Sequence, residues 1–335
     1  MSHSSNWLIG VVALVACAGA SFWWMNRTSS YLDPNDPPKF AEDTVVAPPI
    51  KFDGARAMKY LKQICDIGPR ISGSEGMRKQ QAIIEKHFTD LGATVTRQEF
   101  KARQRSQTAD TPMTNLVIAW QPEKTRRVIF CAHYDTRPIA DQEDNPNNWT
   151  RPFVSANDGA SAVAMLMELA HHMKDVKSDL GVDFVLFDGE EYVFKSSRNG
   201  GDDKYFFGSE YFGEQYKKTK ETRKHKYEAA ILMDLCHAKG ASLKVEIHSF
   251  QFAPKLVESV WATANAMKAK SFEWKEGPTV QDDHLALNEA GIPAIDLIDF
   301  DYVHWHKLTD TPDKISPDQM AEVANVLTAW VQGVK

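Results

Sequence analysis

Carboxylate side chains follow directly on an apolar run in the stretch GVDFVLFDGEEYVF, residues 181–194. The run FVLF has the composition of a buried strand, and Asp188, Glu190 and Glu191 follow it directly. Burying a carboxylate without a partner is costly unless its pKa shifts or a nearby positive charge compensates it. The stretch therefore predicts a positively charged partner for this acidic cluster.

Acidic or imidazole residues also follow other apolar runs, namely His133 and Asp135, Asp234, and His304 and His306. Asp158 leads into a helical pattern, and a loop carries Gln281-Asp282-Asp283-His284. If the runs form a mostly parallel sheet, these side chains meet at the carboxyl edge, where ligands bind in such folds. So many carboxylates would repel one another without a cation. Carboxylate oxygen with imidazole nitrogen suits a catalytic Zn²⁺ that keeps an open position.

Spacing alone divides the possible roles only in part. Glu190 and Glu191 are adjacent, so their side chains point in different directions in an extended segment. One carboxylate can then bind a metal while the other acts as general acid and base. His304 and His306 lie two residues apart, and by spacing either can serve as a ligand.

Strand-like and helical patterns alternate along the chain. Strands are expected at residues 115–120, 127–132, 182–187, 229–235 and 294–298, and helices at 55–65, 77–91, 158–173, 252–269 and 316–334. Asp158 is expected to cap the third of these helices, and the capping-box pattern Ser316-x-x-Gln319 opens the last. The alternation predicts an α/β domain, with helices on both faces of a mixed, mostly parallel central sheet in a three-layer α/β/α sandwich.

The N-terminal segment is apolar. Trp7 to Met25 has nineteen residues without a charge, about the length of a membrane-spanning helix. We expect residues 1–30 to form an uncleaved membrane anchor, with the catalytic domain on the extracytoplasmic side, periplasmic or extracellular. Leu14-Val15-Ala16-Cys17 also resembles a lipoprotein cleavage site, and a cleaved signal segment is a further alternative.

The rest of the chain reads as a linker and one domain. Residues 31–51 are rich in proline and are expected to form an extended linker, followed by a catalytic domain over residues 52–335. The formal net charge of −6 argues against nucleic acid as the main partner. The four cysteines show no disulfide framework.

Five motifs resemble, in order and spacing, those of the zinc-dependent M28 peptidase superfamily. They are His133-x-Asp135, Asn157-Asp158-Gly159-Ala160-Ser161, Gly189-Glu190-Glu191, Asp234 and His306. The resemblance covers residues 52–335 and implies the zinc aminopeptidase-like fold.

The resemblance also implies roles for individual residues. The zinc ligands would be Asp158, Glu191 and His306. Glu190 would be the general acid and base, supported by the acidic pair of Asp234 and Asp282, and Trp305 would form a wall of the substrate pocket. His133 and Asp234 match the ligands of a second zinc ion.

Two chemistries occur in this superfamily. Aminopeptidases use two zinc ions to release an N-terminal residue, whereas glutaminyl cyclases typically use one to convert N-terminal glutamine into pyroglutamate and ammonia. The Asp282-Asp283-His284 loop, the Trp305-His306 pair and the segment from His133 to Pro138 resemble the cyclases. Residues 192–196 lack the tryptophan that animal cyclases carry after the acidic pair.

These features predict a glutaminyl-peptide cyclotransferase that binds one zinc ion and acts on peptides or proteins with N-terminal glutamine. A di-zinc aminopeptidase is the alternative. A membrane-anchored peptide-binding module without activity is a more remote one, because Asp158, Glu190, Glu191 and His306 are all present.

Overall fold

The computed structural model describes residues 32–33, 35–39 and 46–334. The chain divides into two compact units, Met1–Tyr31 and Leu32–Lys335, and the first lies outside the described residues. No helix in the described part of the chain is long and apolar enough to span a membrane. The expected anchor, residues 1–30, falls outside that part and stays a prediction.

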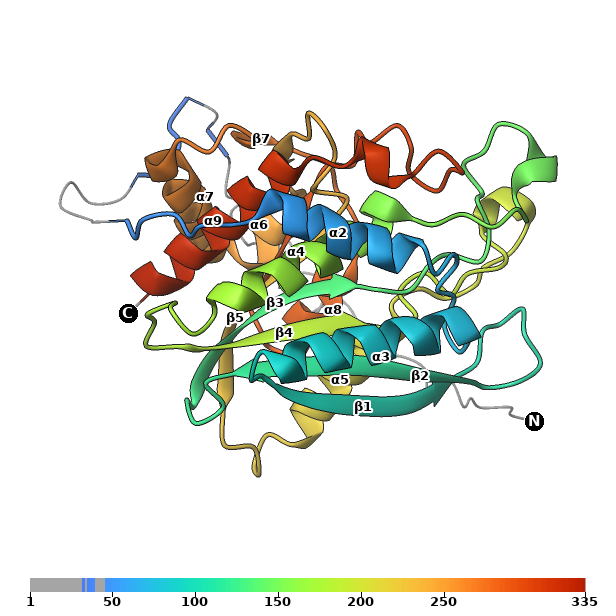
Figure 1. Ribbon diagram of the computed structural model, residues 1–335, viewed down its shortest axis with the longest axis horizontal. Coiled ribbons are helices and arrows are strands. Elements are labelled where there is room, and N and C mark those ends of the chain that lie inside the picture. The colour runs from blue at the N-terminus through green and yellow to red at the C-terminus, as the bar shows by residue number, and fades with distance from the viewer. Residues whose placement is uncertain (1–31, 34, 40–45, 335) are drawn as a thin grey trace, which may run out of the picture. The chain divides into compact units, whose positions relative to one another are not determined.

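A six-stranded mixed sheet forms the centre of the unit Leu32–Lys335 (Figure 1). In spatial order its strands are β1 (Thr94–Ala102), β2 (Thr111–Trp120), β4 (Gly181–Phe187), β3 (Arg126–His133), β5 (Lys226–Asp234) and β8 (Ala294–Ile298). The pairs β1–β2 and β2–β4 are antiparallel, and the other three are parallel. The mixed, mostly parallel sheet predicted from the sequence is confirmed.

Helices cover the two faces of the sheet. They are α2 (Gly54–Cys65), α3 (Glu75–Asp90), α4 (Ser161–Leu169), α5 (Phe207–Lys218), α6 (Ile247–Phe252), α7 (Pro254–Met267), α8 (Asp283–Glu289) and α9 (Pro317–Gly333). In Figure 1, α2, α4 and α9 pass in front of the strands. A small second sheet pairs β6 (Leu243–Val245) with β7 (Phe272–Glu276).

Adjacent residues of strand β3 point to opposite faces of the sheet and pack into two separate apolar cores. Phe130 of β3 belongs to the larger core, with side chains from α2, α4, α7 and α9. Its neighbour Ile129 belongs to the other core, with Phe212 of α5 and Leu287 of α8. Because both faces are covered, all seven residues of β4 are buried, as continuous apolar runs predict for parallel strands. The layers are therefore helix, sheet and helix.

The expected elements are present, but the start of one helix is not where the sequence placed it. The chain makes an irregular turn over Ala156–Ala160, and α4 begins at Ser161 without a side-chain cap. Asp158 lies inside this turn with non-helical backbone angles, and Ala160 occupies the cap position of α4, so the predicted capping role of Asp158 is wrong. Gly159 has φ +91°, and a Cβ there would lie 2.9 Å from Cε1 of His133. This close approach makes glycine necessary at the turn.

Other local predictions can be compared in the same way. The hydroxyl of Ser316 accepts a hydrogen bond from the backbone N–H of Gln319, which confirms the predicted cap of α9. Leu32, from the stretch expected to be linker, is buried in the larger core. Trp274 donates a hydrogen bond to the carbonyl of Asp33, so this part of the stretch packs against the catalytic unit. Strands β1, β6 and β7 and helices α5, α6 and α8 were not predicted.

Candidate active site

Three predicted metal ligands converge at the carboxyl edge of the sheet. Asp158, Glu191 and His306 each offer a ligand atom within 4.8 Å of the other two. Nε2 of His306 lies 3.6 Å from Oδ2 of Asp158 and is hydrogen-bonded to Glu191. All three residues are buried. They come from the turn before α4, from the loop after β4 and from the loop after β8, so only the fold brings them together.

A second group of ligands shares Asp158 with the first. Nε2 of His133 lies 3.2 Å from Oδ1 of Asp158 and 3.3 Å from Oδ1 of Asp234. Ligands at about 2.0–2.1 Å from a tetrahedral zinc ion are separated by about 3.3 Å from one another. The spacing between these side chains is therefore that of metal ligands.

Unpartnered buried atoms support the same interpretation. Within the described residues, the buried atoms without a hydrogen-bond partner include both ring nitrogens of His133, Oδ2 of Asp158, Oε2 of Glu191 and Oδ1 of Asp234. Buried polar atoms are normally satisfied, so these residues fit a zinc site that would satisfy them.

The charges at the centre are strongly coupled. Burial raises the pKa of Glu190 well above its usual range, and the charge of Glu191 raises it further. Burial acts to lower the pKa of His306, but Glu191 and Asp141 outweigh it and raise the pKa to about 9. Without a metal ion, protons therefore neutralise part of the carboxylate charge, and metal binding would displace them.

Asp135 fixes the backbone of the acidic pair. Its two carboxylate oxygens accept hydrogen bonds of 3.1 Å from the backbone N–H groups of Glu190 and Glu191. Asp188 accepts hydrogen bonds from the N–H of Thr114 and the hydroxyl of Ser72, as expected for a structural residue. The three acids of the stretch 188–191 therefore have different surroundings.

Asp141 was not identified from the sequence, yet it contacts the centre directly. His306 donates from Nδ1 to Oδ1 of Asp141 over 2.9 Å. Arg137 donates to the other oxygen of Asp141 over 3.0 Å and lies 3.7 Å from Oε1 of Glu191. Asp141 lies in the long irregular segment after β3, where no pattern in the sequence marks it. Its partner His306 is 165 residues away.

The backbone around the ligands is held in unusual conformations. His306 has φ +51°, and Leu235, directly after Asp234, has φ +50°. Asp310 accepts hydrogen bonds from the N–H groups of Asn157 and Asp158. Non-glycine residues adopt positive φ only where surrounding contacts enforce it, so the fold fixes these ligands in place.

The remaining predicted residues surround the metal-type cluster. Burial raises the pKa of Asp282 well above its usual range, with a further contribution from Asp234. The catalytic role of Asp234 and Asp282 as an acidic pair stays a prediction. The ring of Trp305 packs against that of His306 with 4.1 Å between centroids, and it also contacts Phe300. His304 is hydrogen-bonded to Thr309 instead, and it belongs to none of the ligand groups.

The fold and the site define an α/β scaffold with a metal-type centre of carboxylates and imidazoles at the carboxyl edge of its sheet. The profile of peptidase family M28 matches residues 115–331, and the chain belongs to this family. Within the family it is a homologue of the glutaminyl cyclases.

Individual relatives include both chemistries. The chain is similar to the crystal structure of Fimbriiglobus ruber glutaminyl cyclase, with 53% identity, a TM-score of 0.85, and coverage of 88% of this chain and 100% of that one. It is 22% identical to the Bos taurus glutaminyl-peptide cyclotransferase over 81% of this chain and 84% of the relative. A leucine aminopeptidase precursor from Bacteroides thetaiotaomicron is 29% identical, with a TM-score of 0.79 and coverage of 87% and 100%.

Proposed function

We propose that this protein is a glutaminyl-peptide cyclotransferase that converts the N-terminal glutamine of peptides or proteins into pyroglutamate and releases ammonia. The observation that carries the proposal is the 53% identity to a bacterial glutaminyl cyclase over 88% of the chain. The buried group of Asp158, Glu191 and His306 supports the proposal, because its atoms could hold the metal ion that this chemistry needs.

The substrate already contains its nucleophile. The α-amine of an N-terminal glutamine can attack its own γ-carbonyl carbon to close a five-membered ring. A carbon–nitrogen bond forms, the bond to the side-chain amide nitrogen breaks, and ammonia departs. Zinc held by Asp158, Glu191 and His306 would supply Lewis-acid polarisation of the γ-carbonyl oxygen.

Glu190 is the proposed proton carrier. It would take a proton from the attacking amine and deliver it to the departing nitrogen. Burial raises the pKa of Glu190, which favours donation of a proton to the departing nitrogen. Asp234 and Asp282 would assist as a coupled acidic pair. The ring of Trp305 would help hold the reacting atoms together, which raises their effective concentration.

A di-zinc aminopeptidase is the second candidate function. It is favoured by the second ligand group, in which His133 lies within 3.3 Å of oxygens from both Asp158 and Asp234. Zinc content separates the two: about one ion per chain supports the cyclase, and two ions per chain support the peptidase.

The N-terminal segment supports a separate proposal about location. We infer from Trp7 to Met25 that the protein is anchored in a membrane with its catalytic domain outside the cytoplasm. Protease treatment of spheroplasts carrying the full chain tests this location, because the protease then reaches the periplasmic, outer side of the inner membrane. Degradation of the catalytic domain supports it, and protection until the spheroplasts are lysed contradicts it.

Mass spectrometry tests the proposed activity. The zinc-loaded protein should convert a peptide with N-terminal glutamine into a product lighter by one ammonia, and a chelator should abolish the conversion. The same peptide with N-terminal glutamate serves as a matched control. An unchanged glutamine peptide would contradict the proposal.

A further inference from the structure

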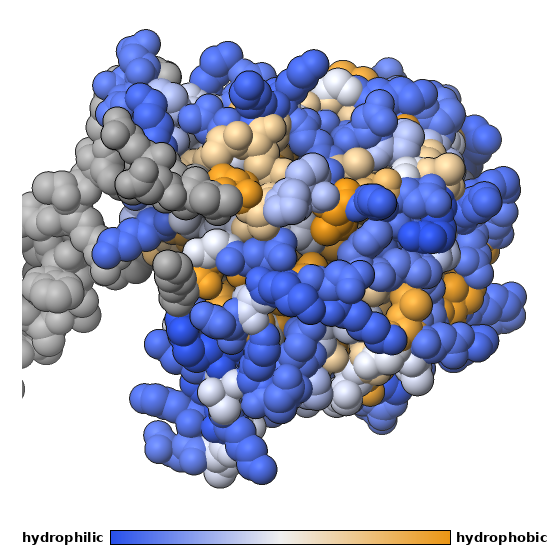
Figure 2. All heavy atoms as spheres, turned by 60° about the vertical axis from the view of Figure 1, so that its left-hand side comes forward, coloured by the Kyte–Doolittle hydropathy of each residue, from blue (hydrophilic) through white to orange (hydrophobic). Residues whose placement is uncertain are grey.

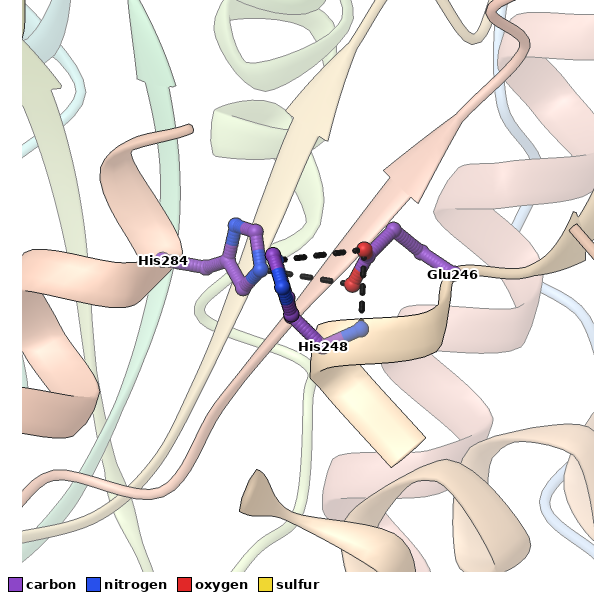
Figure 3. Close-up of side chains that lie close together, drawn as sticks. All are labelled: Glu246, His248 and His284. Atoms are coloured by element: carbon purple, nitrogen blue, oxygen red, sulfur yellow. Dashed lines mark hydrogen bonds and ion pairs between the residues drawn. The ribbon is translucent and has the colours of Figure 1, made fainter. Parts of the chain in front are cut away.

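A buried carboxylate with two neighbouring imidazoles lies apart from the metal-type centre. Glu246, His248 and His284 group their side chains beside α6 and α8 (Figure 3). Glu246 and His284 are fully buried. Glu246 stands directly before α6, and His284 is the second residue of α8. None of the predicted catalytic roles uses this group.

The carboxylate of Glu246 is already fully engaged. Oε1 accepts hydrogen bonds from the backbone N–H groups of His248 at 2.9 Å and Val280 at 3.0 Å. Oε2 accepts one from the N–H of Ser249 at 2.5 Å and lies 3.3 Å from Nε2 of His284. A carboxylate has about four acceptor sites, so the three backbone N–H groups occupy most of them, and the His284 ring, whose nitrogens have no other hydrogen-bond partner among the described residues, lies next to the carboxylate.

The imidazole of His248 also has a hydrogen-bond partner. Nδ1 of His248 lies 2.9 Å from the carbonyl oxygen of Val280, to which it can donate. A ring nitrogen that donates a proton cannot bind a metal ion through the same atom. The contacts of Glu246 and His248 therefore favour an anchor made of backbone hydrogen bonds and a carboxylate–imidazole contact over a second kind of metal site.

The carboxylate of Glu246 contacts Val280 and His284, which lie on either side of Asp282 in the sequence. Val280 is two residues before it, and His284 is two residues after it. Asp282 itself caps α8 through a hydrogen bond from the N–H of Asp283. Movement of either anchored point would therefore be transmitted to the Asp282 carboxyl.

A hydrogen bond connects the segment around Glu246 to the central sheet. Asp296 in β8 donates its backbone N–H to the hydroxyl of Ser249 over 2.9 Å, so the start of α6 is tied to the central sheet. The backbone N–H of the same residue, Ser249, donates to the side-chain carboxylate of Glu246. The contacts therefore run from the sheet through α6 and Glu246 to the loop that carries Asp282.

We propose that Glu246 and His284 form a positioning pair that holds Asp282 in the geometry required for proton transfer. The proposal rests on the cyclotransferase function and on the role of Asp282 in it. It assigns no contact with substrate to either residue.

The informative substitution is His284→Leu, which removes the partner of Glu246, with His284→Gln as the conservative variant that can still donate to it. Because a misplaced catalytic group can lower the rate by about 100-fold per ångström, we expect His284→Leu to lower kcat for a glutamine peptide about 10- to 100-fold. KM should stay within about 2-fold, because substrate binding does not depend on Asp282 in this account. His284→Gln should recover most of the lost kcat.

A control and a second variant separate positioning from a general loss of structure. His171→Leu removes another partly buried histidine, hydrogen-bonded to Tyr60, and should keep wild-type kcat. Glu246→Asp keeps the charge but shortens its reach, and should lower kcat as His284→Leu does. Rates are expressed per zinc-loaded chain, so that a fraction of unfolded protein does not mimic the effect.

Three results would overturn the positioning role. They are wild-type kcat in both His284→Leu and Glu246→Asp, an equal loss in His284→Gln and His284→Leu, and the loss of one zinc equivalent in His284→Leu, which would indicate a metal site. If the wild-type protein itself fails to cyclise the peptide, the proposed function fails first. If the wild type is active and the variants match it, only the positioning role fails.

Discussion

Asp141 accepts a hydrogen bond from Nδ1 of His306, while Nε2 of the same ring faces Asp158 and Glu191. The Asp141 contact determines which ring nitrogen carries the proton and leaves the other available as a metal ligand. Arg137 donates to Asp141 and also lies beside Glu191. The buried side chains of Asp141 and Arg137 therefore orient His306 and Glu191, two of the three proposed zinc ligands, on the side away from the metal site.

Replacement of Asp141 should weaken zinc binding. In Asp141→Asn the amide cannot accept from both His306 and Arg137, so the imidazole loses its fixed orientation. We expect zinc affinity to fall about 10- to 100-fold, measured by competition with a chromophoric chelator. Asp144→Asn, an exposed position in the same loop, is the control and should bind like wild type. Equal affinities for Asp141→Asn and wild type would show that this contact does not orient the ligand.

Glu190→Gln should separate catalysis from metal binding. The amide cannot carry the transferred proton, so kcat should fall about 10²- to 10⁴-fold while zinc content stays at the wild-type level. Zinc is measured by elemental analysis of the same samples used for kinetics. Glu214→Gln, in the exposed part of α5, serves as the control. Loss of the metal in Glu190→Gln would mean that Glu190 and Glu191 have exchanged roles.

The buried ion pair between Arg127 and Asp183 should matter for stability. Both side chains are 3% exposed, and Tyr227 also donates to Asp183. Arg127→Met leaves the Asp183 carboxylate buried without its charge partner, which should lower the free energy of unfolding by about 3–5 kcal/mol. Lys86→Met removes an exposed pair with Asp90 and should cost less than about 1 kcal/mol. Urea unfolding measures the free energy of unfolding of both variants. Similar decreases in the two would contradict the expected difference between the buried and the exposed pair.

His237 should make the protein less stable in acid. Burial lowers the pKa of His237 to about 3, so the folded chain keeps this ring neutral while the unfolded chain protonates it near its ordinary value of 6.5. Between these values the unfolded state binds more protons, and stability falls as the pH falls, by up to about 1.4 kcal/mol per pH unit. Urea unfolding of wild type and His237→Gln between about pH 7 and pH 4 measures the difference. A difference that does not change with pH would refute the assignment.

The sequence was sufficient to locate much of the centre. Asp158, Glu191 and His306 lie far apart along the chain, but each follows an apolar run or precedes a helical one. Parallel strands place such ends on one edge of a sheet, so alternation of strands and helices was enough to predict that they converge. The resemblance to the M28 superfamily then selected His306 over His304, which spacing could not do.

Tertiary contacts determined the rest. Asp158 was expected to cap a helix because the apolar period after it fixes the helix axis but not its first residue. Its actual backbone follows from Gly159 packing against His133 and from Asp310, which binds its N–H. Strand β1 was missed because it lies at the sheet edge, and none of its residues is fully buried, so it lacks an apolar signal.

A comparison of two reactions by one preparation tests the central claim most directly. The zinc-loaded protein is given a peptide with N-terminal glutamine and, separately, a leucine anilide, and the release of ammonia and of the aniline is measured. The account predicts rapid release of ammonia from the first substrate and none of the aniline from the second. Efficient release of the aniline with no ammonia from the glutamine peptide would contradict it and identify the protein as an aminopeptidase.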